Sequence, residues 1–198
     1  IRIMRKVFIA LAAIAALAAV AYSQRALIAE RVMEKALPSR MGANLLDQLP
    51  DGLHVGLCGA GGPMPSPVAS GPCVVVAAGQ RLFMIDSGTN GVRNLARMGF
   101  QPGTLEAVFL THFHSDHLDG LGETGTIRWA GGDNTKPLPV YGPKGIKKVV
   151  RGFNLAYSQD FTYRHDHHGD TVAPLSGAGL KAMQFNKPPI GELTALIS

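Results

Sequence analysis

Runs of apolar residues in the middle of the chain predict a sheet with helices outside it. Strands are predicted at residues 53–58, 73–78, 81–86 and 105–110, and a helix is predicted at residues 89–98. Gly79 and Gln80 leave only two residues between the second and third strands, which predicts a hairpin. Gly99 ends the helix, and Pro102-Gly103 turns the chain into the fourth strand. This order of elements indicates an α/β fold with a mixed sheet.

The first 23 residues have a pattern of their own. Three basic residues precede an uncharged, alanine-rich apolar run at residues 7–22, and Ala21 and Ser23 provide small residues at its end. A basic start, an apolar run and small residues at a cleavage position predict an export signal. The alternatives are a retained membrane anchor, although a bilayer span takes about 20 apolar residues, and an ordinary buried helix. The protein is therefore expected to be exported, and to be periplasmic or membrane-anchored.

The rest of the chain is expected to form one domain. With 46% hydrophobic residues in 198, the chain can bury one sizeable core, and nothing in the sequence indicates a second. Residues 24–52 are interpreted as a helical linker, with a helix at residues 24–37 that Pro38 ends. Residues 53–198 then contain the folded domain.

The charge balance does not favour a polyanion as partner. The whole chain has a net charge of +5, but residues 1–23 carry three basic and no acidic groups, so the remainder has a net charge of +2. A protein that binds a nucleic acid backbone usually carries a larger, clustered excess of basic residues. Lys144, Lys147, Lys148 and Arg151 do form a stripe at helical spacing, but a solvated face of an amphipathic helix is the favoured interpretation. Nucleic acid is thus not expected, without being excluded.

Residues 111–120, Thr-His-Phe-His-Ser-Asp-His-Leu-Asp-Gly, contain four potential metal ligands in six positions. The apolar strand before them and the short helical turn after them place the ligands at a strand-to-helix corner. His112 and His114 share one side of an extended segment, so they can reach one cation together. Asp116 and His117 point elsewhere and can serve a second cation about 3.5 to 4 Å away. A solvated polar loop is the alternative, but it does not explain why three of the seven histidines lie in this window.

This motif, His-x-His-x-Asp-His, resembles the signature of the metallo-beta-lactamase superfamily. The segments 56–63, 82–88 and 139–143 occur in the order typical of its ribonuclease Z and arylsulfatase-like branch. Within that branch, segments 71–73, 128–129 and 163–169 resemble periplasmic arylsulfatase-like proteins. The resemblance covers roughly residues 53 to 170 and implies an αββα sandwich made of two similar halves.

The resemblance also implies a site with two zinc ions. His112 and His114 would bind the first ion, and Asp116 and His117 the second, with Asp116 also catalytic because it can steer the proton of the nucleophile. Asp86 resembles the superfamily aspartate that holds the metal loop by hydrogen bonds. Plain turn chemistry, Asp before Ser-Gly, is an equally weighted alternative for Asp86.

A second histidine cluster, His165, His167 and His168, follows Arg164. The resemblance places it at the active-site mouth, so Arg164, His167 and His168 are predicted to bind an anionic substrate group. These histidines could instead supply a missing zinc ligand, or form a surface turn capped by Gly169.

The two cysteines lie at neighbouring strand ends. Cys58 ends one predicted strand and Cys73 begins the next, so a hairpin-like connection could bring them within disulfide range. Two buried free thiols are the alternative. Neither cysteine has the Cys-x-x-Cys spacing of a metal ligand.

A complete two-metal site in this superfamily needs another histidine, a bridging aspartate and a last histidine. No histidine follows His168. The chain is therefore expected to be a C-terminally incomplete piece of the sandwich and to be inactive alone.

The function expected of the parent protein is zinc-dependent hydrolysis of a small-molecule ester of sulfate, phosphate or a related acid by metal-activated water. One alternative is a ribonuclease Z-like phosphodiesterase acting on RNA 3′ ends, which predicts a cytoplasmic protein with a basic arm. The other is a non-catalytic metal-binding protein. The sequence does not indicate an oligomeric state.

Overall fold

The computed structural model describes residues 44–186, together with scattered positions between residues 4 and 27. The chain divides into two compact units, residues 1–43 and 44–198. Nearly all described positions of the first unit are helical and exposed. No helix among the described residues combines the length and apolar character that a bilayer span requires. Most residues of the predicted export signal and of the predicted linker lie outside the described residues, and the described end of the linker contains the 3₁₀ turn η1 (Leu45–Gln48).

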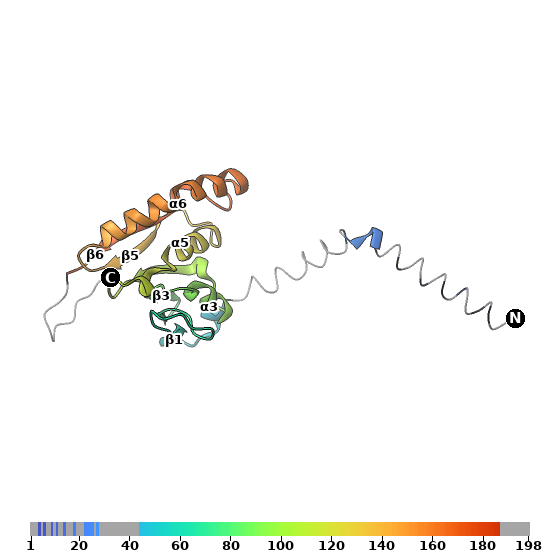
Figure 1. The fold of residues 1–198 in the computed structure, drawn as a ribbon, viewed down its shortest axis with the longest axis horizontal. Coiled ribbons are helices and arrows are strands. Elements are labelled where there is room, and N and C mark those ends of the chain that lie inside the picture. The colour runs from blue at the N-terminus through green and yellow to red at the C-terminus, as the bar shows by residue number, and fades with distance from the viewer. Residues whose placement is uncertain are drawn as a thin grey trace. The chain divides into compact units, whose positions relative to one another are not determined.

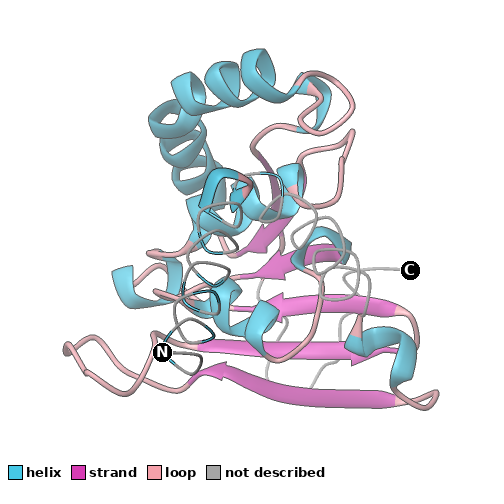
Figure 2. Cartoon of the chain, turned by 90° about the vertical axis from the view of Figure 1, so that its right-hand side faces the viewer, coloured by secondary structure: helices cyan, strands magenta, loops and turns pink. Residues whose placement is uncertain are grey.

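The second unit is built on one six-stranded sheet (Figure 2). In spatial order the strands are β1 (Leu53–Gly59), β2 (Cys73–Ala78), β3 (Arg81–Ile85), β4 (Leu105–Phe109), β5 (Leu138–Gly142) and β6 (Leu180–Gln184). The first three strands pair antiparallel, and β3 to β6 pair parallel. This mixed sheet confirms the predicted α/β fold, and the four strands predicted from the sequence are its first four.

Helices cover one face of the sheet. They are α3 (Gly91–Arg97), α4 (Ser115–Leu118), α5 (Leu121–Ala130) and α6 (Ile146–His168), with 3₁₀ turns η2 (Pro102–Thr104) and η3 (Leu175–Gly177). Helix α3 packs on β1, α6 packs on β5 and β6, and α5 lies between α3 and α6 (Figure 1). The start of α6 is amphipathic as predicted, since Ile146 and Val150 are buried while Lys147, Lys148 and Arg151 are exposed.

Alternation along the strands explains which face is covered. On β2, the buried residues Cys73, Val75 and Ala77 alternate with less buried neighbours, and the buried set faces the helices. On β1, Leu53, Val55 and Leu57 point to the other face and remain 72%, 65% and 68% exposed. Of the αββα sandwich, the described residues therefore contain one helix layer and one sheet.

The segment Arg128-Trp129 is part of the core. Trp129 is fully buried and its Nε1 donates to the carbonyl of Pro174 at 2.8 Å. The Arg128 guanidinium donates to the carbonyls of Leu105 and Lys136, and burial lowers its pKa. Both side chains join α5 to the connections around it, so their role here is structural.

The parallel pairing of strands determines where functional side chains can lie close together. Strands β3, β4 and β5 all end at the same edge of the sheet, and in such sheets ligands bind outside the carboxyl ends of the strands. Asp86 follows β3, and the motif at residues 111–120 follows β4. Helix α6 begins after β5 at this edge and, over 23 residues or about 34 Å, runs back to the opposite edge, where the chain enters β6.

Cys58 and Cys73 form a disulfide between β1 and β2, with Cα atoms 5.0 Å apart. Both side chains are buried, at 2% and 1% exposed. The bond closes the β1–β2 loop, residues 59–72, over a sequence separation of 15. The structure therefore contains the disulfide that the positions of the two cysteines at neighbouring strand ends allowed.

Changing both cysteines to serine should lower the free energy of unfolding by about 3 kcal/mol, because the unfolded chain loses a cross-link over about 15 residues. Urea unfolding of the intact protein, followed by circular dichroism, measures this. As a matched control, reductant should destabilise the parent protein by a similar amount and leave the double variant unchanged. Equal stability of variant and parent would contradict the expectation.

Candidate metal centre

The turn after β3 is bonded to the motif through its backbone. The amide of Asp86 donates to the carbonyl of Phe109, and that of Ser87 to the carbonyl of His117, both at 2.8 Å. The amide of Gly120 in turn donates to the carbonyl of Ser87 at 2.8 Å. Asp86 adopts φ 57°, a left-handed conformation that aspartate tolerates better than most residues. The turn and the motif therefore form one unit at the sheet edge.

The Asp86 carboxylate is the centre of this unit. It is 6% exposed and accepts hydrogen bonds from the Thr111 amide at 2.8 Å, the Thr111 hydroxyl at 2.9 Å and His117 Nδ1 at 2.8 Å. Both sequence interpretations of Asp86 therefore hold, because it turns the chain and its side chain also holds the motif.

These bonds determine which imidazole nitrogens carry a lone pair. Since His117 Nδ1 donates to Asp86, His117 Nε2 carries the lone pair. The Thr111 hydroxyl gives its proton to Asp86, so it accepts from His112 Nδ1 at 2.9 Å. His112 Nε2 then also carries a lone pair. A second ring nitrogen bound to a carboxylate or hydroxyl is the usual support of a metal-binding histidine.

The structure brings three predicted imidazoles into contact. His112 Nε2 lies 2.9 Å from His114 Nδ1, and the ring centroids of His112 and His117 are 4.1 Å apart. Asp116, at the start of α4, lies beside them with Oδ2 3.7 Å from His117 Nε2. His114 is extended and α4 begins directly after it, which is the predicted strand-to-helix corner.

The donor set fits divalent cations, although its atoms are hydrogen-bonded to one another. Among the described residues, no three histidine, cysteine or carboxylate side chains are arranged to hold one ion together. Two nitrogens on one tetrahedral zinc ion lie about 3.3 Å apart, and the 2.9 Å between His112 and His114 is the span of a shared proton. If a zinc ion replaced that proton, the distance between the two nitrogens of His112 and His114 would need to grow by only about 0.4 Å. The ligand set of His112, His114, Asp116 and His117, and the two zinc ions, remain predictions.

The second histidine cluster is not at this site, which corrects the predicted place of His167 and His168. They form the exposed last turn of α6, capped by Gly169, whose amide donates to the His165 carbonyl at 2.7 Å. His165 Nδ1 donates to the carbonyl of Ala173 at 3.0 Å. The sequence resemblance did not show that α6 carries this segment to the opposite edge of the sheet. Arg164, one turn earlier, pairs with Asp160.

A hollow of about 340 Å³ lies beside Asp116. Its wall is the disulfide-closed β1–β2 loop, including Pro63, Met64 and Ala69, and none of its lining residues is lysine, arginine or histidine. The loop is held by Asn94, whose Nδ2 donates to the Cys58 carbonyl at 2.8 Å and to the Ser70 hydroxyl at 2.9 Å. Neither this wall nor the role of Thr111 was predicted, and only the Gly-Pro composition of the loop indicated a turn.

The structure therefore gathers three imidazoles and a carboxylate, which are ligand types that divalent cations take, at the carboxyl edge of a mixed sheet. A family model described as the metallo-beta-lactamase superfamily matches residues 67–181. The chain belongs to the metallo-beta-lactamase superfamily of metal-dependent hydrolases, as the motif implied.

Similar proteins refine this picture. Ribonuclease Z of Mycobacterium bovis (strain BCG / Pasteur 1173P2) is 37% identical over 124 residues, which are 62% of this chain and 44% of that protein. Ribonuclease Z of Mycolicibacterium gilvum (strain PYR-GCK) is 36% identical, over 62% of this chain and 43% of that protein. The chain thus spans less than half the length of these curated relatives. The metallo-beta-lactamase fold protein YhfI from Bacillus subtilis has a similar fold, with a TM-score of 0.51, 23% identity and coverage of 73% of this chain and 50% of that one.

Proposed function

We propose that the intact protein is a phosphodiesterase and that the motif at residues 111–117 supplies the first ligands of its metal centre. The observation that carries the proposal is the network in which Asp86, directly and through Thr111, leaves a lone pair on Nε2 of both His117 and His112, beside His114 and Asp116. The choice of a phosphodiester is supported by relatives named ribonuclease Z. RNA is accordingly the first substrate to test, in place of the small ester favoured by the sequence.

When bound, zinc ions would supply a water with a pKa near 7 and a Lewis acid for the phosphoryl oxygen. The residues of the chain would position these ions and accept the proton of the water. His112 and His114 present adjacent nitrogens, while Thr111 and Asp86 hold the imidazole tautomers. Asp116 lines the hollow, and its carboxylate, 13% exposed, can accept the proton of the attacking water.

A second candidate is hydrolysis of a small ester of sulfate or phosphate. The specific observation in its favour is the hollow beside Asp116, whose lining contains two carboxylates and no basic side chain. Such a surface suits an uncharged leaving group better than a phosphate backbone.

An exported location is also part of the proposal. The buried Cys58–Cys73 disulfide supports it, because disulfides persist mainly in oxidising compartments. The basic and apolar pattern of residues 1–23 supports it independently.

The test compares substrates on the intact protein. Bis(p-nitrophenyl) phosphate and RNA with a 3′ extension should be cleaved, activity should vanish with a chelator, and zinc should restore it. Aryl sulfate and aryl phosphate monoesters serve as controls. Turnover of the sulfate alone would reject the phosphodiesterase proposal in favour of the second candidate, and chelator-resistant turnover would reject both.

A further inference from the structure

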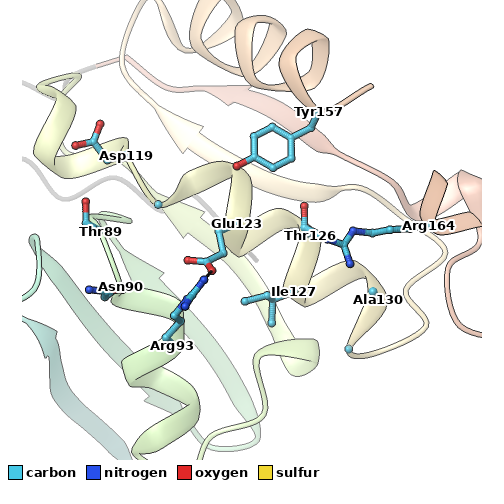
Figure 3. A pocket seen from close by; sticks show the side chains of 12 residues that line it. Thr89, Asn90, Arg93, Asp119, Glu123, Thr126, Ile127, Ala130, Tyr157 and Arg164 are labelled. Atoms are coloured by element: carbon cyan, nitrogen blue, oxygen red, sulfur yellow. Dashed lines mark hydrogen bonds and ion pairs between the residues drawn. The ribbon is translucent and has the colours of Figure 1, made fainter. Parts of the chain in front are cut away.

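A second, larger hollow adjoins the metal motif. It is a groove of about 780 Å³ on the helix-covered face, between α3, α5 and α6 (Figure 3). Thr89, Asn90 and Asp119 line both this groove and the hollow that contains Asp116. The groove and the hollow therefore adjoin at these three residues. From Asp119 the groove follows the ten residues of α5, about 15 Å, and ends near Arg164.

The arginines of the groove are held in place and keep donors available. Arg164 uses Nε to bind Asp160 at 2.7 Å, and no other described residue bonds its two terminal nitrogens. Arg93 binds one oxygen of Glu123 through Nε at 2.6 Å and through one terminal nitrogen. In Figure 3 both side chains border the groove, from α3 and α6. A carboxylate behind a guanidinium restricts its motion, and its remaining N–H groups suit a phosphate oxygen.

Other polar side chains of the groove are also available to form hydrogen bonds with a ligand. Among the described residues, no hydrogen bond engages the side chains of Thr89, Asn90, Asp119 or the hydroxyl of Tyr157. The Tyr157 ring lies over Gly122, where an added Cβ would be 2.3 Å from it, so only glycine leaves room for the ring. A partly exposed aromatic ring is a surface on which a base can stack.

The charges in the groove limit what it can bind. Two arginines are balanced by Asp119 and Glu123, so the groove would not hold a long polyanion. Carboxylate and amide oxygens do accept hydrogen bonds from hydroxyl groups, and a 2′-hydroxyl is the group that distinguishes RNA from DNA. The length of about 15 Å corresponds to roughly two to four nucleotides at 3.4 Å or more each.

We propose that this groove binds a short single-stranded stretch of RNA next to the scissile phosphodiester, with phosphates at Arg93 and Arg164, ribose hydroxyls at Asp119 and Asn90, and a base on Tyr157. This inference rests on the proposed function and names its substrate. The groove makes the enzyme prefer an oligonucleotide to a small diester, since only the oligonucleotide reaches Arg164.

The test compares two substrates that would both be cleaved at the metal motif but differ in length. Arg164→Gln should raise KM for an RNA trinucleotide about tenfold and leave KM for bis(p-nitrophenyl) phosphate unchanged, because the small diester does not extend along α5. Arg151→Gln is the matched control: it removes the same charge from an exposed position of the same helix outside the groove. A trinucleotide of DNA should bind more weakly than its RNA counterpart.

Binding to the chelator-treated protein separates the two proposals. Fluorescence anisotropy with a labelled RNA trinucleotide should show about tenfold weaker binding for Arg164→Gln and none of this loss for Arg151→Gln. Equal binding or equal KM for both variants overturns the groove assignment even if phosphodiesters are cleaved. Loss specific to Arg164→Gln without any phosphodiester cleavage overturns the proposed function and retains the groove as an RNA site.

Discussion

Changing His112 and His114 together to alanine should reduce phosphodiester hydrolysis by the intact protein at least about a thousandfold. A bound metal contributes several kcal/mol of transition-state stabilisation, and about 4 kcal/mol corresponds to this factor. The variant should stay folded, because His114 is exposed, His112 is half-buried, and their side chains bond to each other and to Thr111. Bound zinc should fall from about two ions per chain, as elemental analysis would show.

The matched control for this variant is His167→Ala with His168→Ala. It removes the same number of imidazoles from the exposed end of α6, which lies at the other edge of the sheet. We expect unchanged zinc content and activity. Activity retained without His112 and His114, or lost equally in the control, would contradict the placement of the metal centre.

Changing Asp86 to asparagine should weaken zinc binding by about 10- to 100-fold, the usual effect of removing a group that orients metal-binding histidines. Asparagine also tolerates the left-handed backbone at this position, so the backbone remains as it is. The amide group, however, cannot accept from both Thr111 and His117 as the carboxylate does. Hydrogen bonds to a charged group contribute about 1.5 to 3 kcal/mol, so the melting temperature should fall as well.

Thr111→Val separates the two arms of the Asp86 network. It removes the hydroxyl between Asp86 and His112 but keeps the Thr111 amide bond and the direct bond to His117. Its zinc affinity, measured by competition with a chromogenic chelator, should lie between those of the parent and Asp86→Asn. Unchanged affinity in Asp86→Asn would show that the network does not support the metal centre.

The sequence predicted the elements of the fold where the residue pattern is local. Alternation in Cys73–Ala78 and the two-residue turn after it gave the β2–β3 hairpin, and Gly99 with Pro102 gave the end of α3 and the entry into β4. The strand-to-helix corner at the motif was equally local, because its ligands lie within six residues.

Features that depend on contacts between distant parts of the chain could not be predicted from the sequence pattern. The length of α6 is set by packing of Ile146 and Val150 on the sheet at one end and by Gly169 at the other, and no local signal showed that His167 would lie at the far edge. Thr111 could have been noticed, since a hydroxyl adjoins the first histidine, but its partner Asp86 is 25 residues away. The groove depends on three helices and could be found only in the structure.

The turn at residues 86–90 has a practical consequence for genetics. Asp86 and Ser87 bond to the motif, while Thr89 and Asn90 line both hollows. Substitutions in these five residues will therefore be pleiotropic, since a shift of this backbone displaces the cation ligands and the walls of both hollows at once. Variants that separate one phenotype from the other must come from positions remote from this turn, such as Arg164.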